Sequence, residues 1–322
     1  MAQLTESRLI HVESELDTYI ARVHARELLQ RMGFGETARV EVETAVAELT
    51  QNVFRHGVRG MAWLRASQAR FEIVCRDEGP GFAGTREMPS TGLGIGLDGV
   101  RRLMDRVTVE DLPGGGAQVQ ADRWLRTQPA AGPAWDAAVR TAVALRPARG
   151  EIRCSDGYVA APTGEGMLLA VVDGLGHGDA AYAGAQVVLR HFAQHAREPL
   201  PLLLRGAHEA ARGTRGAVAF AAVLGPKGIL RAAGLGNVRG VVLGPGLHLP
   251  SVPGCLGVSW QEPVLTEMSA PSGARLLLET DGVESLPQLR VSGVSPRFLV
   301  EQALAGSTGR DDALAAVAEC GG

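Results

Sequence analysis

The segment from Leu168 to Asp179, LLAVVDGLGHGD, places a carboxylate between an apolar run and a glycine-rich turn. Leu168 to Val172 is the continuous apolar run typical of a strand buried on both faces, and the glycines after it allow a sharp turn. Asp173 at the strand end, beside the backbone carbonyl of Gly174, offers the oxygen ligands that Mg²⁺ and Mn²⁺ prefer. The pattern predicts a metal site, but it fits equally well a strand followed by a turn that the aspartate caps.

Further aspartates stand beside apolar runs elsewhere in the carboxy-terminal half: Asp156 in CSDGY, Asp281 in LLLETDGVE, and Asp311 with Asp312 in GRDDALAAV. Acidic residues at separate strand ends can converge on two metal ions, which activate water and neutralise a phosphoryl group. Each Asp-Gly pair taken alone is usually a turn. The set therefore predicts a hydrolytic site provided that the fold brings these segments together.

A second set of chemical groups lies in the amino-terminal half. Glu48 and Asn52 lie one turn apart on the helix predicted from Glu36 to His56, whose apolar residues recur at helical spacing. A strand predicted from Arg70 to Arg76 leads directly into Asp77, Gly79 and Gly81. Taken alone, Glu48 and Asn52 are also consistent with solvated helix positions.

A glycine-rich loop follows in the stretch TGLGIGLDGVRRLMDRV, where Gly92, Gly94 and Gly96 precede a helix with one apolar stripe. Free backbone N–H groups in such a loop, and the helix dipole behind them, favour a bound polyphosphate. The glycine pattern is weak by itself. Its order after the other two amino-terminal motifs makes the whole set far more specific.

The composition limits the classes of protein to consider. The length of 322 residues favours two domains, and a net charge of -3 without a basic run argues against nucleic acid. The amino terminus lacks a signal-peptide core, no segment has the length of a membrane span, and the four cysteines are scattered. We therefore expect a cytoplasmic protein that binds neither nucleic acid nor a membrane.

The elements that must position these groups fall into two parts. The segment TQPAAGP has no periodicity and two prolines, so we predict domains at residues 1–127 and 135–322, joined by a linker at 128–134. In the first domain, residues 4–34 contain helix-forming runs with Ser14 or Asp17 as the cap and Gly33 as the stop. Strands are predicted at 61–64, 70–76 and 117–125, with a turn at 111–116.

Short apolar runs dominate the second domain and predict strands at 139–145, 157–161, 167–172, 217–224, 229–232, 239–243 and 275–279. Long helices are predicted only at 180–196 and 201–212. This order fits an antiparallel β core flanked by helices better than a βαβ array. The whole chain is therefore expected to be α+β.

The amino-terminal motifs, in this order, resemble the GHKL ATPase superfamily, and VETAVAELTQNVFRHG with GLGIGLDGVRRLMD resembles its RsbW and RsbT group of anti-sigma and switch kinases. The resemblance covers about residues 36–125 and implies a Bergerat α/β sandwich that binds ATP with Mg²⁺. It implies that Asn52 holds the magnesium and that Glu48 is the general base. The adenine would be bound at Asp77, Gly79 and Gly81, and the lid over the phosphates would be Gly92, Gly94 and Gly96.

Two positions near this motif set need separate comment. Where the family usually has a Gly-Thr pair entering its last strand, this chain has Gly115, Gly116, Ala117 and Gln118, so the resemblance implies that a hydroxyl near the adenine is missing. His56 is close to the motif in sequence, but a polar surface position after the helix accounts for it better. Nucleotide affinity is therefore less firmly predicted than the fold.

The carboxy-terminal order of Asp156, DGLGHG, GLGN, ETDG and RDD resembles the PPM-type metal-dependent serine/threonine phosphatases, in particular their SpoIIE and RsbX branch, over about residues 135–319. The segments Arg215 to Ala217 and Pro253 to Gly257 fit that branch too. The resemblance implies an αββα sandwich with two Mn²⁺ or Mg²⁺ ions and direct hydrolysis without a covalent phospho-enzyme. Its implied ligands are Asp173 as the bridge, Asp281 and Asp311 on one ion, and Asp156 with the Gly174 carbonyl on the other.

Two further residues of these motifs have less certain roles. Asp312 is expected to support the ligands rather than to bind metal. The position of His177 differs from that in the DGHG branch, so turn stabilisation explains it as well as general acid catalysis does.

The two resemblances together imply a bacterial stress or sigma-factor regulator that fuses a serine/threonine kinase to the phosphatase opposing it. The expected partners are STAS-domain anti-anti-sigma or stressosome scaffold proteins, with a sigma factor or downstream regulator as a further partner. Because a kinase and a phosphatase that both ran freely would waste ATP, we expect each activity to be controlled against the other, through domain contact or a homodimer. Two alternatives stay open: a nucleotide-gated binding module fused to an active phosphatase, and a catalytically weak switching scaffold.

Overall fold

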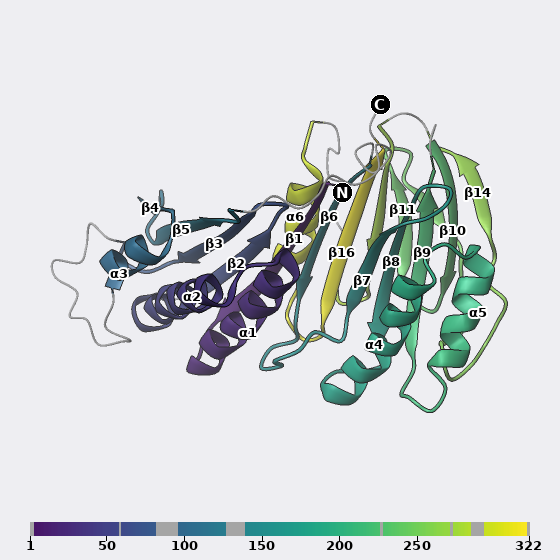
Figure 1. Cartoon of the computed structure of the whole chain (residues 1–322), viewed down its shortest axis with the longest axis horizontal. Helices are drawn as coiled ribbons and strands as arrows, with labels where there is room; N and C mark the ends of the chain where they lie inside the picture. Colours follow the sequence, from purple (N-terminus) through teal and green to yellow (C-terminus); the bar gives the residue numbers. More distant parts are fainter. Residues whose placement is uncertain are drawn as a thin grey trace. The chain divides into compact units, whose positions relative to one another are not determined.

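The computed structural model describes residues 3–57, 59–81, 96–126, 139–225, 228–270, 273–284 and 293–320 (Figure 1). The chain divides into two compact units, one of residues 6–129 and the other of residues 130–322 with residues 1–5. The predicted linker at 128–134 lies outside the described residues. No helix of the described part is long and apolar enough to cross a membrane.

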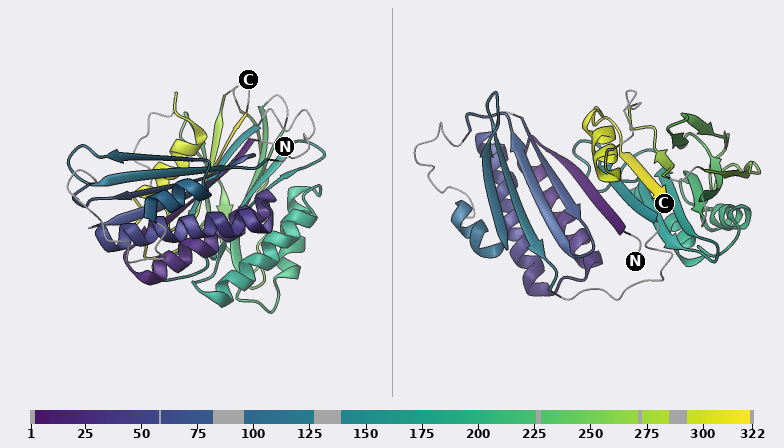
Figure 2. Two further views of the ribbon diagram at one scale, coloured as in Figure 1. Left: turned by 60° about the vertical axis from the view of Figure 1, so that its left-hand side comes forward. Right: turned by 90° about the horizontal axis from the view of Figure 1, so that it is seen from above.

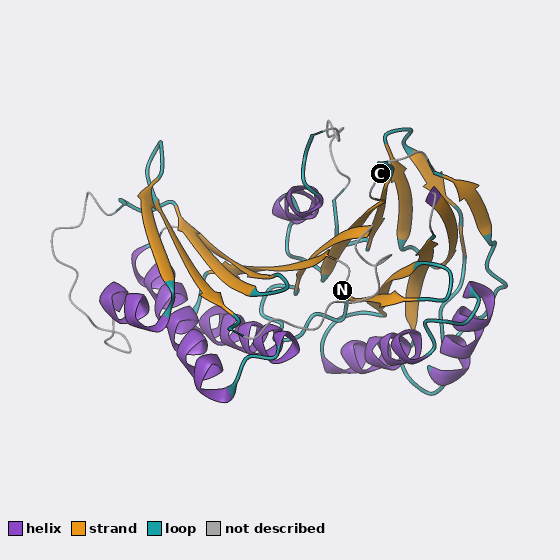
Figure 3. Ribbon diagram, turned by 45° about the horizontal axis from the view of Figure 1, so that its top comes forward, coloured by secondary structure: helices purple, strands orange, loops and turns teal. Residues whose placement is uncertain are grey.

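The amino-terminal unit is an antiparallel sheet in the order β1-β2-β3-β5-β4 with helices packed on one face (Figures 2 and 3). Its elements are β1 (Gln3–Val12), α1 (Glu15–Met32), α2 (Glu36–His56), β2 (Gly60–Ala66), β3 (Arg70–Asp77), α3 (Gly96–Leu103), β4 (Arg106–Asp111) and β5 (Ala117–Trp124). Leu28 of α1 and Leu49 of α2 are buried in one core with Phe71 and Ile73 of β3. The core therefore lies between the helical layer and the sheet.

The local signals of this unit predicted its helices well. Helix α2 has the predicted bounds, and α1 begins after Ser14 and ends at Gly33, whose φ of 82° is the left-handed conformation that glycine adopts readily. The carboxylate of Asp17 accepts a hydrogen bond from the Ser14 N–H at 2.7 Å, which completes a capping box. Both predicted cap residues therefore take part in starting α1.

The prediction of helix-forming runs from residue 4 onward was wrong for the first segment, which is strand β1. This strand pairs antiparallel with β2, with Ile10 opposite Ala62 and Arg8 opposite Leu64. A partner far away in the sequence supplies these hydrogen bonds, so local propensity did not reveal it. The helix predicted beyond the glycine loop is also shorter, because α3 ends at Leu103 and strand β4 follows.

The carboxy-terminal unit is an αββα sandwich of two sheets, with orders β12-β11-β15-β16-β6 and β13-β10-β9-β8-β7. Its strands are β6 (Val139–Arg146), β7 (Gly157–Pro162), β8 (Met167–Gly174), β9 (Ala217–Leu224), β10 (Ile229–Leu235), β11 (Arg239–Leu243), β12 (Leu247–Leu249), β13 (Ser251–Val252), β14 (Thr266–Ser269), β15 (Arg275–Glu279) and β16 (Ala313–Cys320). Helices α4 (Asp179–Gln194) and α5 (Leu200–Ala210) pack on the second sheet, and α6 (Pro296–Ala305) packs on β6 and β16. Strand β14 pairs with β10.

Two apolar layers hold this sandwich together. Val143 and Leu278 of the first sheet share a buried core with Leu169 and Phe220 of the second. The other face of the second sheet is buried against α4 and α5, for example at Phe192. All the strands predicted in this half are present, and the antiparallel core flanked by helices is confirmed.

Helix α6 and strand β16 were not among the predicted elements. Helix α6 has 10 residues and β16 has 8, as many as the predicted strand β8, so length does not explain why they were missed. Strand β16 is identified by pairing on both sides, antiparallel with β15 and with β6. These contacts place the segment that begins with Asp311 beside the end of β15.

Candidate functional sites

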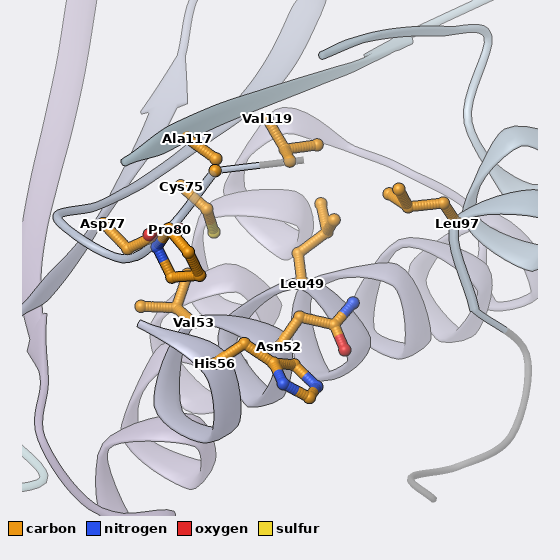
Figure 4. Close-up of a pocket in the computed structure, with 11 residues that line it drawn as sticks. Leu49, Asn52, Val53, His56, Cys75, Asp77, Pro80, Leu97, Ala117 and Val119 are labelled. Carbon is orange, nitrogen blue, oxygen red and sulfur yellow. The ribbon is translucent and has the colours of Figure 1, made fainter. Parts of the chain in front are cut away.

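A pocket in the amino-terminal unit lies between α2, the end of β3, the start of β5 and α3 (Figure 4). Its lining residues are Leu49, Asn52, Val53, His56, Cys75, Asp77, Pro80, Gly81, Leu97, Ala117 and Val119. The walls are mostly apolar, while the Asn52 amide, the Asp77 carboxylate and the His56 imidazole supply polar groups. Such a lining suits a flat apolar ring held by a few polar contacts.

Glu48 lies on α2 one turn before the pocket residue Asn52 and is 4% exposed. Its Oε1 accepts a hydrogen bond from the Gly96 N–H at 3.2 Å, at the start of α3. Its Oε2 is buried and has no hydrogen-bond partner among the described residues. Because an unpaired buried carboxylate oxygen costs free energy, this atom is suited to accept a proton or hydrogen bond from a bound molecule.

Asp77 ends β3, and its Oδ1 accepts a hydrogen bond from the Gly79 N–H at 2.8 Å. The glycines around it leave no room for side chains. A Cβ atom on Gly79 would lie 2.8 Å from Asp77 Oδ1, and one on Gly81, with φ of 74°, would lie 2.7 Å from Asp111 Oδ1. On Gly116, with φ of 94°, it would lie 2.1 Å from the Asp77 carbonyl oxygen. These glycines hold the backbone close to the carboxylate that faces the pocket.

The other predicted nucleotide-site residues are distributed as follows. Gly92 and Gly94 lie outside the described residues, and Gly96 begins α3 with φ of 57°. Ala117 presents a methyl group to the pocket at the position where the family resemblance expects a hydroxyl. His56, interpreted from the sequence as a surface position, is exposed at the end of α2 but also lines the pocket, beside Asn52 in Figure 4.

A second site gathers carboxylates at one end of the carboxy-terminal sandwich. Asp156 immediately precedes β7 and Asp173 ends the apolar run of β8, and the pairing of Gly157 with Val172 brings the two acids opposite each other. Their side chains are hydrogen bonded. Burial, and then the charges of Asp281 and Asp311, raises the pKa of Asp173 to about 7.

Asp156 is the more deeply buried member of this pair, at 5% exposed. Burial first, and then the charges of Asp173 and Asp312, raises the pKa of Asp156 well above its ordinary value. A carboxylate buried beside other carboxylates is stabilised when a cation replaces the shared proton. The electrostatics of the pair therefore favour a bound cation.

Asp281 and Asp311 are exposed and stand at the facing ends of β15 and β16. Asp281 accepts a hydrogen bond from the Asn237 side-chain amide at 2.7 Å, and Asp311 Oδ1 accepts one from the Asp312 N–H at 2.9 Å. Across the described ranges, no group of three or more His, Cys, Asp or Glu side chains is close enough to hold one ion. The carboxylates influence one another electrostatically, but they would have to draw closer to share a cation.

Several side chains hold the acids in position. Thr280 Oγ1 donates a hydrogen bond to Asp156 Oδ2 at 2.7 Å and accepts one from the Leu314 N–H at 2.9 Å, so it links β15, β16 and the acid pair. Asp312 accepts hydrogen bonds from the backbone N–H groups of Ala148 and Ser155 at 2.7 and 2.8 Å. Asp312 thus holds the backbone that directly precedes Asp156, and its expected support of the metal ligands stays a prediction.

Thr280 and Ser155 were not among the predicted site residues, and Asn237 was predicted only as the last residue of the GLGN motif. Each stands within or next to a quoted motif, ETDG, CSDG or GLGN, and that proximity was the available signal. Ser155 Oγ donates to the Gly176 carbonyl at 3.1 Å and also to Asp312. It therefore joins the glycine-rich turn to the acidic segment.

The remaining predicted positions of this site are Gly174 and His177. A Cβ atom on Gly174 would lie 2.5 Å from the Ala181 carbonyl oxygen, so the chain passes too close for any other residue there. His177 is exposed, and its Nδ1 lies 2.7 Å from Glu151 Oε1. This contact favours the interpretation in which His177 stabilises the turn.

Comparison with known proteins assigns the amino-terminal unit to a family. Residues 12–123 match the model of the histidine kinase-like ATPase domain. The serine/threonine-protein kinase RsbT of Bacillus subtilis (strain 168) is 30% identical over 133 residues, which are 38% of this chain and 100% of RsbT. This chain therefore belongs, through its amino-terminal unit, to the same histidine kinase-like ATPase family as RsbT.

Comparison with solved structures identifies the fold of the other unit. RsbX in complex with magnesium is 17% identical, with a TM-score of 0.52, and the match covers 67% of this chain and 100% of RsbX. The Bacillus subtilis SpoIIE fragment that contains the PP2C phosphatase domain is 12% identical, with a TM-score of 0.49, over 79% of this chain and 80% of that chain. The carboxy-terminal unit thus has the RsbX fold, and the predicted kinase–phosphatase fusion is confirmed at the level of family and fold.

Proposed function

We propose that this chain transfers the γ-phosphoryl group of ATP to a serine or threonine of a partner protein and also removes it again. The observation that carries this proposal is the pairing, on one chain, of the RsbT-like pocket with a buried acid pair in an RsbX-like fold. The proposed net reactions are opposite in effect. The first forms a phosphoester and ADP, and the second hydrolyses that ester to the free hydroxyl and inorganic phosphate.

In the proposed kinase reaction, the unpaired Oε2 of Glu48 accepts the proton of the attacking hydroxyl. Asn52, one turn along α2, would hold the magnesium that accompanies ATP. Asp77 would bind the adenine amino group, because it lines the pocket at the position that the resemblance assigns to it. Leu49, Leu97 and Val119 offer an apolar surface for the ring.

In the proposed phosphatase reaction, the donor set fits hard divalent cations, because it consists of oxygen ligands and because burial and neighbouring charges raise the pKa values of two of its carboxylates, Asp156 and Asp173. Asp156, Asp173, Asp281, Asp311 and the Gly174 carbonyl would hold Mn²⁺ or Mg²⁺. When bound, these ions would activate water and neutralise the phosphoryl charge. Thr280 and Asn237 orient two of the carboxylates through hydrogen bonds.

We further propose that the partner is a STAS-domain protein, either an anti-anti-sigma factor or a stressosome scaffold. The resemblance of the amino-terminal motifs to anti-sigma and switch kinases, together with the family relationship to the serine/threonine-protein kinase RsbT, supports a role in stress or sigma-factor regulation. Cys75, Cys154 and Cys255 form no disulfide bond among the described residues, in keeping with a cytoplasmic location, which we also propose.

The test uses the full-length chain, γ-labelled ATP with Mg²⁺, and a STAS-domain protein from the same genome. Label should enter the STAS protein with the wild-type chain but not with Asn52→Ala. The matched control is Gln51→Ala, because Gln51 is the preceding α2 residue and does not line the pocket. Adding Mn²⁺ after ATP is exhausted should release the label, and Asp173→Asn should abolish that release.

Two results would contradict the proposal. If the STAS protein binds only in the presence of nucleotide but never acquires label, the amino-terminal unit is a nucleotide-gated binding module. If purified phospho-STAS protein keeps its label with Mn²⁺ and wild-type chain, the carboxy-terminal unit is a switching scaffold.

A further inference from the structure

Arg215 lies in the segment that leads into β9, beside the end of β8. In the β8–β9 register, Ala217 is opposite Gly174, and the Leu175 N–H donates to the Gly216 carbonyl at 3.3 Å. The glycine-rich turn that follows the acid of β8 is therefore attached directly to the segment carrying Arg215.

The guanidinium of Arg215 lies against Gly176 in that turn. A Cβ atom on Gly176, whose φ is 85°, would lie 3.2 Å from Arg215 Nη2, 3.6 Å from Cζ and 3.7 Å from Nη1. Thr214 Oγ1 holds the backbone on either side of Arg215, donating to the Ala211 carbonyl at 2.6 Å and accepting from the Gly216 N–H at 3.0 Å. The backbone around Arg215 is thus held beside the turn, and its guanidinium lies next to Gly176.

Arg215 is exposed and makes no ion pair or side-chain hydrogen bond within the described residues. Nearby arginines differ in this respect: Arg212 is paired with Glu209 at 2.9 Å, and Arg153 with Asp179 at 3.4 Å. The N–H groups of Arg215 are therefore available to a bound molecule. A guanidinium is well suited to a phosphate because its N–H groups match two phosphate oxygens at once.

We propose that Arg215 binds the phosphoryl group of the phosphatase substrate, an inference that rests on the proposed hydrolytic function. A phosphomonoester dianion approaching Asp173 meets the exposed carboxylates of Asp281 and Asp311, which stand at the facing ends of β15 and β16. A cation on the adjacent turn offsets this repulsion in the free enzyme and holds the ester at the entrance to the acids. In this proposal Arg215 binds the substrate, a role separate from that of the carboxylates that would hold the metal ions.

The experiment compares wild type, Arg215→Ala, Arg215→Lys and the control Arg212→Ala as full-length chains with Mn²⁺. Hydrolysis of p-nitrophenyl phosphate and of a phosphoserine protein is measured, together with the inhibition constant of inorganic phosphate. Arg215→Ala should raise KM for both substrates and the inhibition constant by about 10- to 100-fold, and Arg215→Lys should restore part of the loss. Arg212→Ala should change neither, because its charge is paired away from the turn.

Three outcomes would overturn the assignment. Unchanged KM and phosphate inhibition would mean that Arg215 does not bind the phosphoryl group. If Arg215→Ala raised KM only for the protein substrate, Arg215 would instead bind a carboxylate of the partner protein. If Arg215→Ala lost the Mn²⁺-induced rise in Tm, the role of Arg215 would be to support the turn. If wild type hydrolyses nothing, phosphate binding by calorimetry still tests Arg215, and the failure then belongs to the proposed function.

Discussion

At the scale of single residues, the carboxy-terminal site is defined by charge rather than by shape. Asp156 is buried and lies opposite the half-buried Asp173. Burial and then the charge of Asp173 raise the pKa of Asp156, whereas burial and then the charges of Asp281 and Asp311 raise the pKa of Asp173. Thr280 donates one hydrogen bond to Asp156, and Asn237 donates one to Asp281. Next to the amino-terminal pocket, one buried oxygen of Glu48 lacks a hydrogen-bond partner in the described part of the chain. In both sites the fold buries polar groups without fully compensating the free-energy cost of their burial.

Asp173→Asn should separate stability from metal binding. In EDTA at pH 8, above the Asp173 pKa of about 7, the substitution should raise the free energy of unfolding by about 1–3 kcal/mol, because it removes a charge from an acidic, buried site. The rise in Tm on adding Mn²⁺ should be lost. Thermal unfolding measures both, with Asp179→Asn, an exposed aspartate, as the unaffected control. A variant that still gains stability from Mn²⁺ would remove Asp173 from the ligand set.

Thr280→Val should show how much the acid pair depends on one hydroxyl. The change keeps the side-chain shape but removes the hydrogen bond to Asp156 and leaves the Leu314 N–H unpaired. The free energy of unfolding should fall by about 1–3 kcal/mol in urea denaturation, and Mn²⁺ affinity by about 10-fold or more. Thr280→Ser should retain both properties. Equal stability of the Val and Ser variants would argue against this role.

At the scale of elements, glycines decide how closely the segments of each site approach. Gly174 passes the Ala181 carbonyl, Gly116 passes the Asp77 carbonyl, and Gly176 lies under the Arg215 guanidinium. Strand register then decides which side chains face each other. The sites are therefore built at strand ends, where turns without side chains allow backbone and ligand to approach closely.

Two neighbouring glycines allow a matched comparison. Gly116→Ala would place a Cβ atom 2.1 Å from the Asp77 carbonyl oxygen, whereas Gly114→Ala, at a similar positive φ, meets nothing within 4 Å. Both variants incur backbone strain of about 1–3 kcal/mol, but only Gly116→Ala should also displace Asp77. Calorimetry should therefore show at least about 10-fold weaker ATP binding for Gly116→Ala alone. Equal ATP affinity in the two variants would contradict the close approach at Asp77.

At the scale of the whole molecule, the fusion fixes the ratio of the kinase-like unit to the phosphatase-like unit. One chain carries a unit of the histidine kinase-like ATPase family and a unit with the RsbX fold. If the proposed activities both operate, every addition of enzyme adds kinase and phosphatase equally. Control must then act on the relative rates within the chain.

This ratio leads to a quantitative prediction. With ATP in excess and substrate below both KM values, the steady-state phosphorylated fraction of the STAS protein should not change over about a 10-fold range of enzyme concentration, because both rates scale together. The time needed to reach it should shorten in proportion. Phosphate-affinity gels would measure the fraction. Mixtures of Asn52→Ala and Asp173→Asn chains at varied ratios should instead change it.

The sequence by itself determined the local features of this protein. Helical spacing predicted α2 with its bounds, Ser14 and Gly33 marked the ends of α1, and apolar runs located the strands of the second unit. The order of the motifs was specific enough to show a resemblance to two known families, and that resemblance implied both folds. These signals are encoded by neighbours along the chain, so they can be read without the fold.

Only the tertiary structure decided which groups meet. The first segment became β1 because β2 pairs with it, and Asp156 faces Asp173 because of the β7–β8 register. The contact of Thr280 with Asp156 joins segments that are far apart in the sequence. The physical reason is the same in each case: hydrogen bonds between distant strands set the register, and register rather than local propensity determines which charges are buried together.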